Sequence, residues 1–125
     1  MKVAELMQTN LKTISADSTL ADAITDLAEA QVSALPVVDR FGRAVGVLST
    51  REVLKAESGD VVHEAKVLEL MAPWPTTIDP DLDVRQAAQE MLYLNVQRLF
   101  VEFDGALVGV ISQTDIVGAV ATSRV

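Results

Sequence analysis

The sequence predicts an α/β (α+β) fold in which two tandem strand–helix–strand–strand–helix repeats pack sheet to sheet with pseudo-twofold symmetry. The first observation behind this prediction is an internal repeat, because the segment VAELM at residues 3–7 returns as VLELM at residues 67–71. The second is size: half of the 125 residues are apolar, but a repeat of about 55 residues cannot cover its own sheet. The two sheets are therefore expected to cover each other.

The two copies correspond along most of the chain. The matching pairs in their first part are Thr13/Thr77, Ile14/Ile78, Asp17/Asp81, Ala23/Ala87, Val32/Val96 and Leu35/Leu99. One residue is then missing from the second copy, and the pairs continue as Gly42/Gly105, Gly46/Gly109 and Ser49/Ser112. We predict a first repeat at residues 1–56, a connector at residues 57–66 and a second repeat at residues 67–125.

Each copy is predicted to open with a short strand, around Thr13-Ile14 or Thr77-Ile78, and to continue with a helix. Apolar residues recur every three or four positions in this helix, which places them on one stripe. The stripes are Leu20, Ala23, Ile24, Leu27 and Ala28 in the first copy, and Val84, Ala87, Ala88, Met91 and Leu92 in the second. Thr19 and Asp83 precede the stripes and are the predicted N-caps.

The second half of each copy is predicted to be a strand pair followed by a helix. Strands at residues 34–38 and 99–103 lead, through turns that contain Gly42 or Gly105, to strands at residues 44–48 and 107–111. The last helices are expected to start near Ser49 and Ser112.

Composition favours a soluble protein without nucleic-acid or membrane partners. The net charge is −8 and the sequence pI is about 4.4, whereas nucleic acids and anionic membranes bind basic surfaces. No segment approaches the ~20 apolar residues of a membrane helix, and the first residues carry no apolar signal-peptide core. A cytoplasmic location is therefore expected.

Residue types that carry catalysis or bind metals are sparse. The sequence has no cysteine, and its one histidine, His63, lies in the predicted connector. It has no phosphate-binding loop of the GxxxxGK[ST] type, and no serine has a histidine within its own repeat to form a catalytic triad. We therefore expect neither an enzyme nor a metal site, and we interpret His63 as a solvated connector residue.

The two strand-to-helix corners, GVLSTREV at residues 46–53 and GVISQTDI at residues 109–116, carry the remaining polar motif. Ser49 and Glu52 fit a capping box, and Ser112 and Asp115 are expected to form a poorer one, because the box prefers Glu or Gln. The alternative is a ligand site. A carboxylate at the end of a strand can accept both hydroxyls of a ribose, and a helix N-terminus can meet a phosphate. Both interpretations remain open.

The repeated elements and their motifs resemble a known family. Residues 32–39 (VSALPVVD), 46–49 (GVLS) and 109–116 (GVISQTDI) stand in the order and spacing of a pair of cystathionine-β-synthase (CBS) domains, also called a Bateman module. The resemblance implies a stand-alone regulatory module that requires no cofactor and senses adenosyl small molecules, chiefly AMP, ADP or ATP, in clefts between the two repeats. It also implies a homodimer formed through helix faces, and an effector protein is a further expected partner.

The resemblance also assigns residues to two clefts, each built from both repeats. Cleft one would take Thr13, Ile14, Val32, Ser33, Ala34 and Pro36 from the first repeat, and Ile111, Ser112, Thr114 and Asp115 from the second. Cleft two, the weaker one, would take Thr77, Ile78, Val96, Gln97 and Arg98 from the second repeat, and Leu48, Ser49, Arg51 and Glu52 from the first. Asp115 would hold the ribose hydroxyls of the ligand in cleft one, and Arg98 would face a phosphate in cleft two.

Two departures from the family pattern both fall on cleft two. Glu52 replaces the aspartate of the family, and Phe100 stands where the first copy has Pro36. We therefore expect cleft one to be the better nucleotide site. The competing interpretation is a structural dimerisation module with degenerate clefts and no ligand, in which Ala21, Ala28, Ala119 and Ala121 would allow helices to approach closely.

Overall fold

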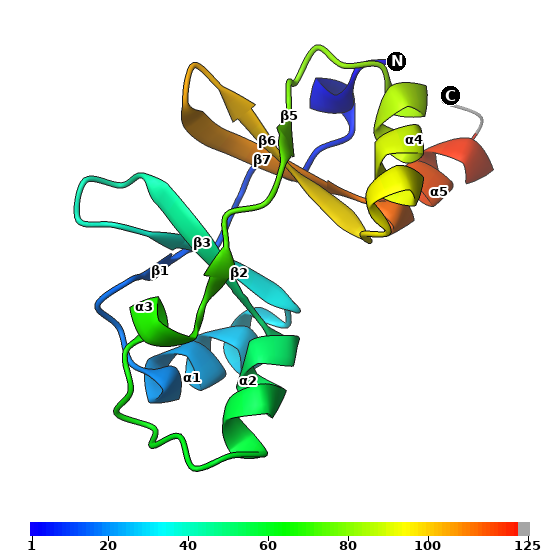
Figure 1. Ribbon diagram of the computed structural model, residues 1–125. Helices are drawn as coiled ribbons and strands as arrows, with labels where there is room; N and C mark the ends of the chain where they lie inside the picture. Colours follow the sequence, from blue (N-terminus) through cyan, green and yellow to red (C-terminus); the bar gives the residue numbers. More distant parts are fainter. Residues whose placement is uncertain (123–125) are drawn as a thin grey trace. The chain divides into compact units, whose positions relative to one another are not determined.

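The chain passes from one structural unit to a second and back again (Figure 1). The computed structural model describes residues 1–122. The central unit comprises Lys12–Pro75, and the terminal unit comprises Met1–Leu11 together with Thr76–Val125. Each unit has its own sheet, its own helices and its own apolar core.

The central unit is built on a sheet with the strand order β1-β2-β3-β4. These strands are β1 (Ile14–Ser15), β2 (Ala34–Val38), β3 (Ala44–Ser49) and β4 (Ala72–Pro73). Strand β1 is parallel to β2, and the other neighbouring strands are antiparallel. The accompanying helices are α1 (Leu20–Ala30), α2 (Thr50–Glu57) and α3 (Val67–Leu70), drawn below the sheet in Figure 1.

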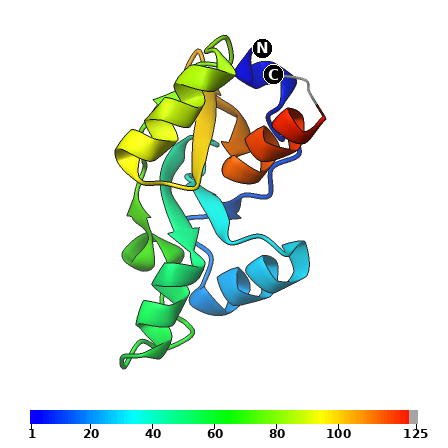
Figure 2. The same cartoon turned by 90° about the vertical axis from the view of Figure 1, so that its right-hand side faces the viewer.

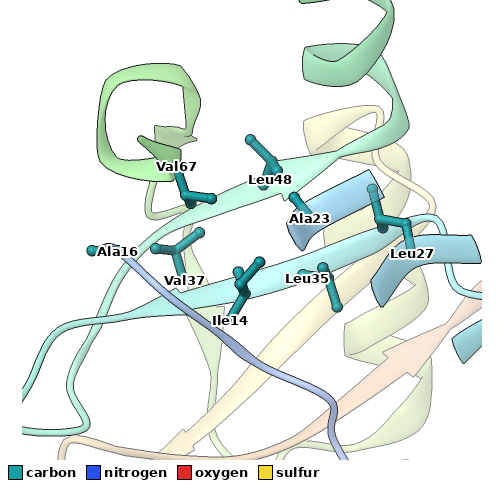
Figure 3. Close-up of a cluster of buried hydrophobic side chains, with 8 residues drawn as sticks. All are labelled: Ile14, Ala16, Ala23, Leu27, Leu35, Val37, Leu48 and Val67. Atoms are coloured by element: carbon teal, nitrogen blue, oxygen red, sulfur yellow. The ribbon is translucent and has the colours of Figure 1, made fainter. Parts of the chain in front are cut away.

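The core of the central unit lies between this sheet and its helices. Strand β2 is apolar throughout because it lies between β1 and β3, and Leu35 and Val37 are fully buried in it. Figure 3 shows the cluster that these residues form with Ile14, Ala16, Ala23, Leu27, Leu48 and Val67. Val67 of α3 belongs to the same core, although it lies 32 positions after Leu35 in the sequence.

The terminal unit has a sheet with the strand order β5-β6-β7. Its elements are the short 3-10 helix η1 (Val3–Glu5), β5 (Thr77–Ile78), α4 (Val84–Leu94), β6 (Arg98–Phe103), β7 (Ala106–Ser112) and α5 (Gln113–Ala121). Strand β5 is parallel to β6, and β6 is antiparallel to β7. Helices α4 and α5 contact each other and the sheet, and Figures 1 and 2 show these elements from two sides. The core consists of Val3, Ile78, Ala87, Met91, Leu99, Val101 and Ile111.

The repeated VAELM and VLELM segments begin the two sequence copies, but each packs in the unit that contains the sheet of the other copy. Residues 3–7 pack in the terminal unit and residues 67–71 in the central unit. The contact is close in both cases. A Cβ atom built on Gly109 would lie 2.7 Å from Met7 Sδ, and one built on Gly46 would lie 2.5 Å from Met71 Sδ. A methyl group at either position would therefore displace the methionine that crosses it, and at Gly46 it would also lie 2.6 Å from the Ala72 carbonyl oxygen.

The predicted N-caps of α1 and α4 are confirmed. The Thr19 hydroxyl accepts a hydrogen bond from the Asp22 N–H at 3.2 Å, and the Asp83 carboxylate accepts one from the Arg85 N–H at 2.8 Å. Both helices end in the left-handed region, at Gln31 (φ 55°) and Asn95 (φ 54°). The chain can leave each helix in this conformation and enter the following strand.

The predicted α/β fold class and the tandem repeat are confirmed. The two helical stripes, the strands at residues 34–38 and 44–48 and their counterparts in the second copy are all present, with ends shifted by a residue. The short elements η1, α3 and β4 were not predicted from the sequence. Within residues 1–122, no helix is both long enough and apolar enough to span a membrane. The boundaries of the sequence repeats, at residues 1–56, 57–66 and 67–125, stay a prediction.

Candidate functional site

The corner between β7 and α5 is a complete capping box. The Ser112 N–H donates to Asp115 Oδ2 at 2.9 Å, and the Asp115 N–H donates to Ser112 Oγ at 3.1 Å. Both side chains are half-buried at the start of the helix. The carboxylate therefore lies in the first turn of α5, where the helix dipole stabilises negative charge.

The corner between β3 and α2 is built from the same positions with a longer acid. Glu52 Oε1 accepts the Ser49 N–H at 2.8 Å and the Ser49 hydroxyl at 2.6 Å. Both bonds fall on one carboxylate oxygen of Glu52, whereas at the other corner the Ser112 hydroxyl accepts the Asp115 N–H. Glu52 also borders a hollow of about 410 Å³ in the central unit, together with Lys55, Met71 and Ala72.

The expectation that Ser112 and Asp115 form the poorer cap is wrong. Both corners form the box, and at α5 each partner bonds the backbone N–H of the other. The aspartate is short, but the extended conformation of Ser112 (φ −115°, ψ 164°) brings its N–H within reach of the carboxylate. Capping therefore does not distinguish the two corners.

Asp115 has a second partner, which was not predicted from the sequence. The Gln8 side-chain amide donates from Nε2 to Asp115 Oδ1 at 3.1 Å. Gln8 follows the VAELM segment and forms an antiparallel bridge with Val110 of β7. The corresponding residue after VLELM is Ala72, which has no polar side chain. This difference between two otherwise matching segments is the sequence signal that could have pointed to Gln8.

In the central unit, the structure brings predicted residues of cleft one next to predicted residues of cleft two. The Thr50 N–H donates to the Ser33 carbonyl at 3.0 Å, and Ala34 pairs with Ser49 across β2 and β3. Thr13 and Val32 are exposed in the adjoining segments, and Ile14 and Pro36 are buried in β1 and β2.

The terminal unit repeats this arrangement. The Gln113 N–H donates to the Gln97 carbonyl at 2.9 Å, and the Gln113 side chain donates to the Val96 carbonyl at 3.3 Å. Arg98 opens β6 and pairs with Ser112 in β7. Thr77 and Ile78 form β5, while Thr114 is exposed in the first turn of α5.

Each unit therefore carries half of each predicted cleft. Thr13, Ile14, Val32–Ala34 and Pro36 lie in the central unit, whereas Ile111, Ser112, Thr114 and Asp115 lie in the terminal unit. The residues assigned to cleft two are divided in the same way. Both clefts stay predictions. We call the residues that one unit contributes to one cleft a half-site, so the structure describes two half-sites in each unit.

His63 is exposed, as predicted, but it has a partner. Its Nε2 lies 2.6 Å from Glu57 Oε1, so the connector is tied to the end of α2. Among residues 1–122, no group of three or more His, Cys, Asp or Glu side chains could hold a metal ion. The His63–Glu57 pair is best explained as a surface contact of the connector.

Comparison with known proteins gives consistent matches over nearly the whole chain. The CBS domain family model matches residues 3–59 and 67–122. A CBS domain-containing protein of Dictyostelium discoideum is 31% identical over 91% of this chain and 87% of its own length. The A-adding tRNA nucleotidyltransferase of Aquifex aeolicus is 29% identical over 96% of this chain, which spans only 14% of that enzyme.

A solved structure shows the same fold with a ligand. The structure of CBSX2 in complex with AMP superposes with a TM-score of 0.87 and 26% sequence identity, covering 99% of this chain and 98% of that one.

Proposed function

Because this chain belongs to the CBS domain family, we propose that it is a regulatory module that binds adenosine-containing nucleotides of the AMP, ADP and ATP class in clefts between its two repeats. The observation that carries the proposal is the Ser112–Asp115 corner, where a half-buried carboxylate and a hydroxyl lie together at the start of α5. The AMP complex of CBSX2, a protein of the same fold, supports this class of ligand.

The proposed chemistry follows from the groups present at this corner. An ionised carboxylate has about four acceptor positions, and two of those on Asp115 are used by Ser112 and Gln8. The remaining positions can accept the vicinal hydroxyls of a ribose, as acidic residues do in dinucleotide sites. The start of α5 and the exposed hydroxyl of Thr114 offer donors to a phosphate.

The half-sites of the central unit would supply the base-binding part of cleft one. Ile14, Ala34 and Pro36 lie on the adjacent strands β1 and β2, and we expect apolar side chains and backbone amides near Ile14 and Ala34 to hold the adenine. In cleft two, Arg98 would face the phosphate, and Glu52 would take the part of Asp115. Glu52 and the buried Phe100 are the reasons to expect weaker binding there.

Calorimetric titration with AMP and ATP tests the proposal. The variant Asp115→Ala should bind AMP about 10- to 100-fold more weakly than the wild type, because hydrogen bonds to a charged group are removed. Glu52→Ala is the matched control from the other corner and should change the affinity of the tighter site little. AMP affinity that is unchanged in Asp115→Ala would overturn the assignment of cleft one.

A structural dimerisation module without a ligand is the second candidate, and one observation favours it. The helices of the terminal unit expose apolar side chains to solvent: Leu92 is 78% exposed, Tyr93 86%, Val117 66% and Val120 59%. Apolar patches of this kind mark protein–protein interfaces, so we propose a homodimer that uses α4 and α5. Sedimentation tests the dimer, and thermal shift separates the two candidates, since AMP at 100 times its Kd should stabilise a binding module by about 2.7 kcal/mol.

A further inference from the structure

We propose that Gln8 is a specificity-determining residue of the Asp115 corner: its side-chain amide competes with a ribose hydroxyl for Oδ1 of the carboxylate, and so lowers the affinity for vicinal diols. This inference rests on the proposed function, because it concerns the same carboxylate. Its basis is the hydrogen bond from Gln8 Nε2 to Asp115 Oδ1 at 3.1 Å, which joins residues 107 positions apart.

The main chain of Gln8 is fixed independently of this bond. Its N–H donates to the Val110 carbonyl at 2.8 Å, and its carbonyl accepts the Val110 N–H at 3.0 Å. The preceding residue, Met7, packs directly over Gly109. The backbone therefore presents the amide to α5 from the edge of β7, and replacing the side chain leaves these backbone contacts in place.

The hydrogen bond from Gln8 reduces the binding free energy that a diol can gain at Asp115. Oδ2 already accepts the Ser112 N–H, and Oδ1 accepts the Gln8 amide. A diol that bonds both carboxylate oxygens in a bidentate way must share or replace the amide on Oδ1. Exchange of one donor for another yields little net free energy, because the bond formed only compensates for the bond lost.

The central unit contains the natural counterpart without this amide. There the corresponding pair is Glu52 and Ala72, and both residues line the hollow of about 410 Å³. A methyl group at position 72 cannot donate a hydrogen bond to the Glu52 carboxylate, as the Gln8 amide does to Asp115. The two units thus place an amide or a methyl group at the same point beside an acidic corner.

Calorimetric titration of Gln8→Ala with AMP and with 2′,3′-dideoxy-AMP tests the inference. The variant should bind AMP about three- to tenfold more tightly than the wild type, and it should bind the dideoxy compound as the wild type does. Gln8→Met, which keeps the length of the side chain but has no donor, should show the same gain, and this separates the hydrogen bond from packing. Ala72→Gln is the matched control, and it should leave the tighter AMP site unchanged.

The outcomes separate this inference from the proposed function. AMP affinity that is equal or weaker in both Gln8→Ala and Gln8→Met, with the wild type binding AMP, would overturn the role of Gln8 alone. An equal gain for the dideoxy compound would also overturn it, since the gain would then not involve the diol. Binding of AMP by Gln8→Ala but not by the wild type would support it, whereas no AMP binding by any of these proteins would contradict both proposals.

Discussion

The central and terminal units place the same elements in the same order, but they complete their acidic corners differently. In the terminal unit, the carboxylate of Asp115 bonds the helix cap with one oxygen and the Gln8 amide with the other. In the central unit, both bonds from Ser49 fall on Glu52 Oε1, and the segment that crosses beside it contributes Ala72. The shared capping box holds each acid in place, and the segment that crosses beside it determines whether a side-chain amide also bonds the acid.

The largest testable difference in stability between the two units concerns Gly109 and Gly46, which the VAELM and VLELM segments cross. Gly46→Ala should destabilise the protein by about 2–3 kcal/mol and Gly109→Ala by about 1–2 kcal/mol, because overpacking a closed contact forces the neighbours to move. The new methyl group would lie 2.6 Å from the Ala72 carbonyl oxygen in the first case, but 3.0 Å from the Gln8 carbonyl oxygen in the second.

Urea unfolding of both variants, alone and combined with Met71→Ala or Met7→Ala, measures this difference. Removing the methionine side chain should recover most of the loss at Gly109 and less of it at Gly46, because at Gly46 the backbone clash remains. Equal losses with full recovery in both units would show that only the flexible side chains are in contact.

A smaller difference separates the N-caps of α1 and α4. Asp83→Ala should cost about 1–2 kcal/mol and Thr19→Ala about 1 kcal/mol, since both remove a cap but only the aspartate also adds charge at a helix N-terminus. Asp83 Oδ2 also lies 3.8 Å from the N-terminal ammonium group. Thermal unfolding at low and high salt measures the electrostatic contribution to each loss of stability. The loss should shrink at 1 M NaCl for Asp83→Ala and stay constant for Thr19→Ala. The same salt dependence in both variants would argue against the charge.

The smallest effect is expected where α1 and α4 end. Gln31 and Asn95 both have positive φ, but asparagine tolerates this conformation better than glutamine does. Gln31→Gly should therefore stabilise the protein by about 0.5–1 kcal/mol, and Asn95→Gly should change the free energy of unfolding by a few tenths. A gain for Asn95→Gly as large as that for Gln31→Gly in urea unfolding would contradict this reasoning.

The features that were predictable from the sequence are those set by neighbouring residues. The stripe of α1, the Thr19 and Asp83 caps and the strands of the repeat all depend on spacings of a few residues. Helix α3 is only four residues long, and it is stable because Val67 is buried with Leu48 and Val37. The repeat VAELM/VLELM can be recognised in the sequence, but no local pattern predicts which of the two sheets each segment packs against.

The candidate site shows the same limit. The residue types of the two corners indicated both capping and ligand binding, and the hydrogen bonds of Ser112 and Asp115 confirm the capping part. Gln8 lies outside any periodic pattern, and its bond to Asp115 depends on the fold bringing the chain start to β7. The combination of half-sites into clefts stays a prediction, because it depends on both units together.

The central claim is that the Ser112–Asp115 corner binds an adenosine nucleotide more tightly than the Ser49–Glu52 corner. The most direct measurement is an NMR titration of the ¹⁵N-labelled wild-type protein with AMP, followed at the backbone amides of both corners. We expect saturable shifts of the amides of Ser112, Thr114 and Asp115 at AMP concentrations below those that shift Ser49 and Glu52. Shifts that appear first at Ser49 and Glu52, or the absence of shifts at both corners, would contradict it.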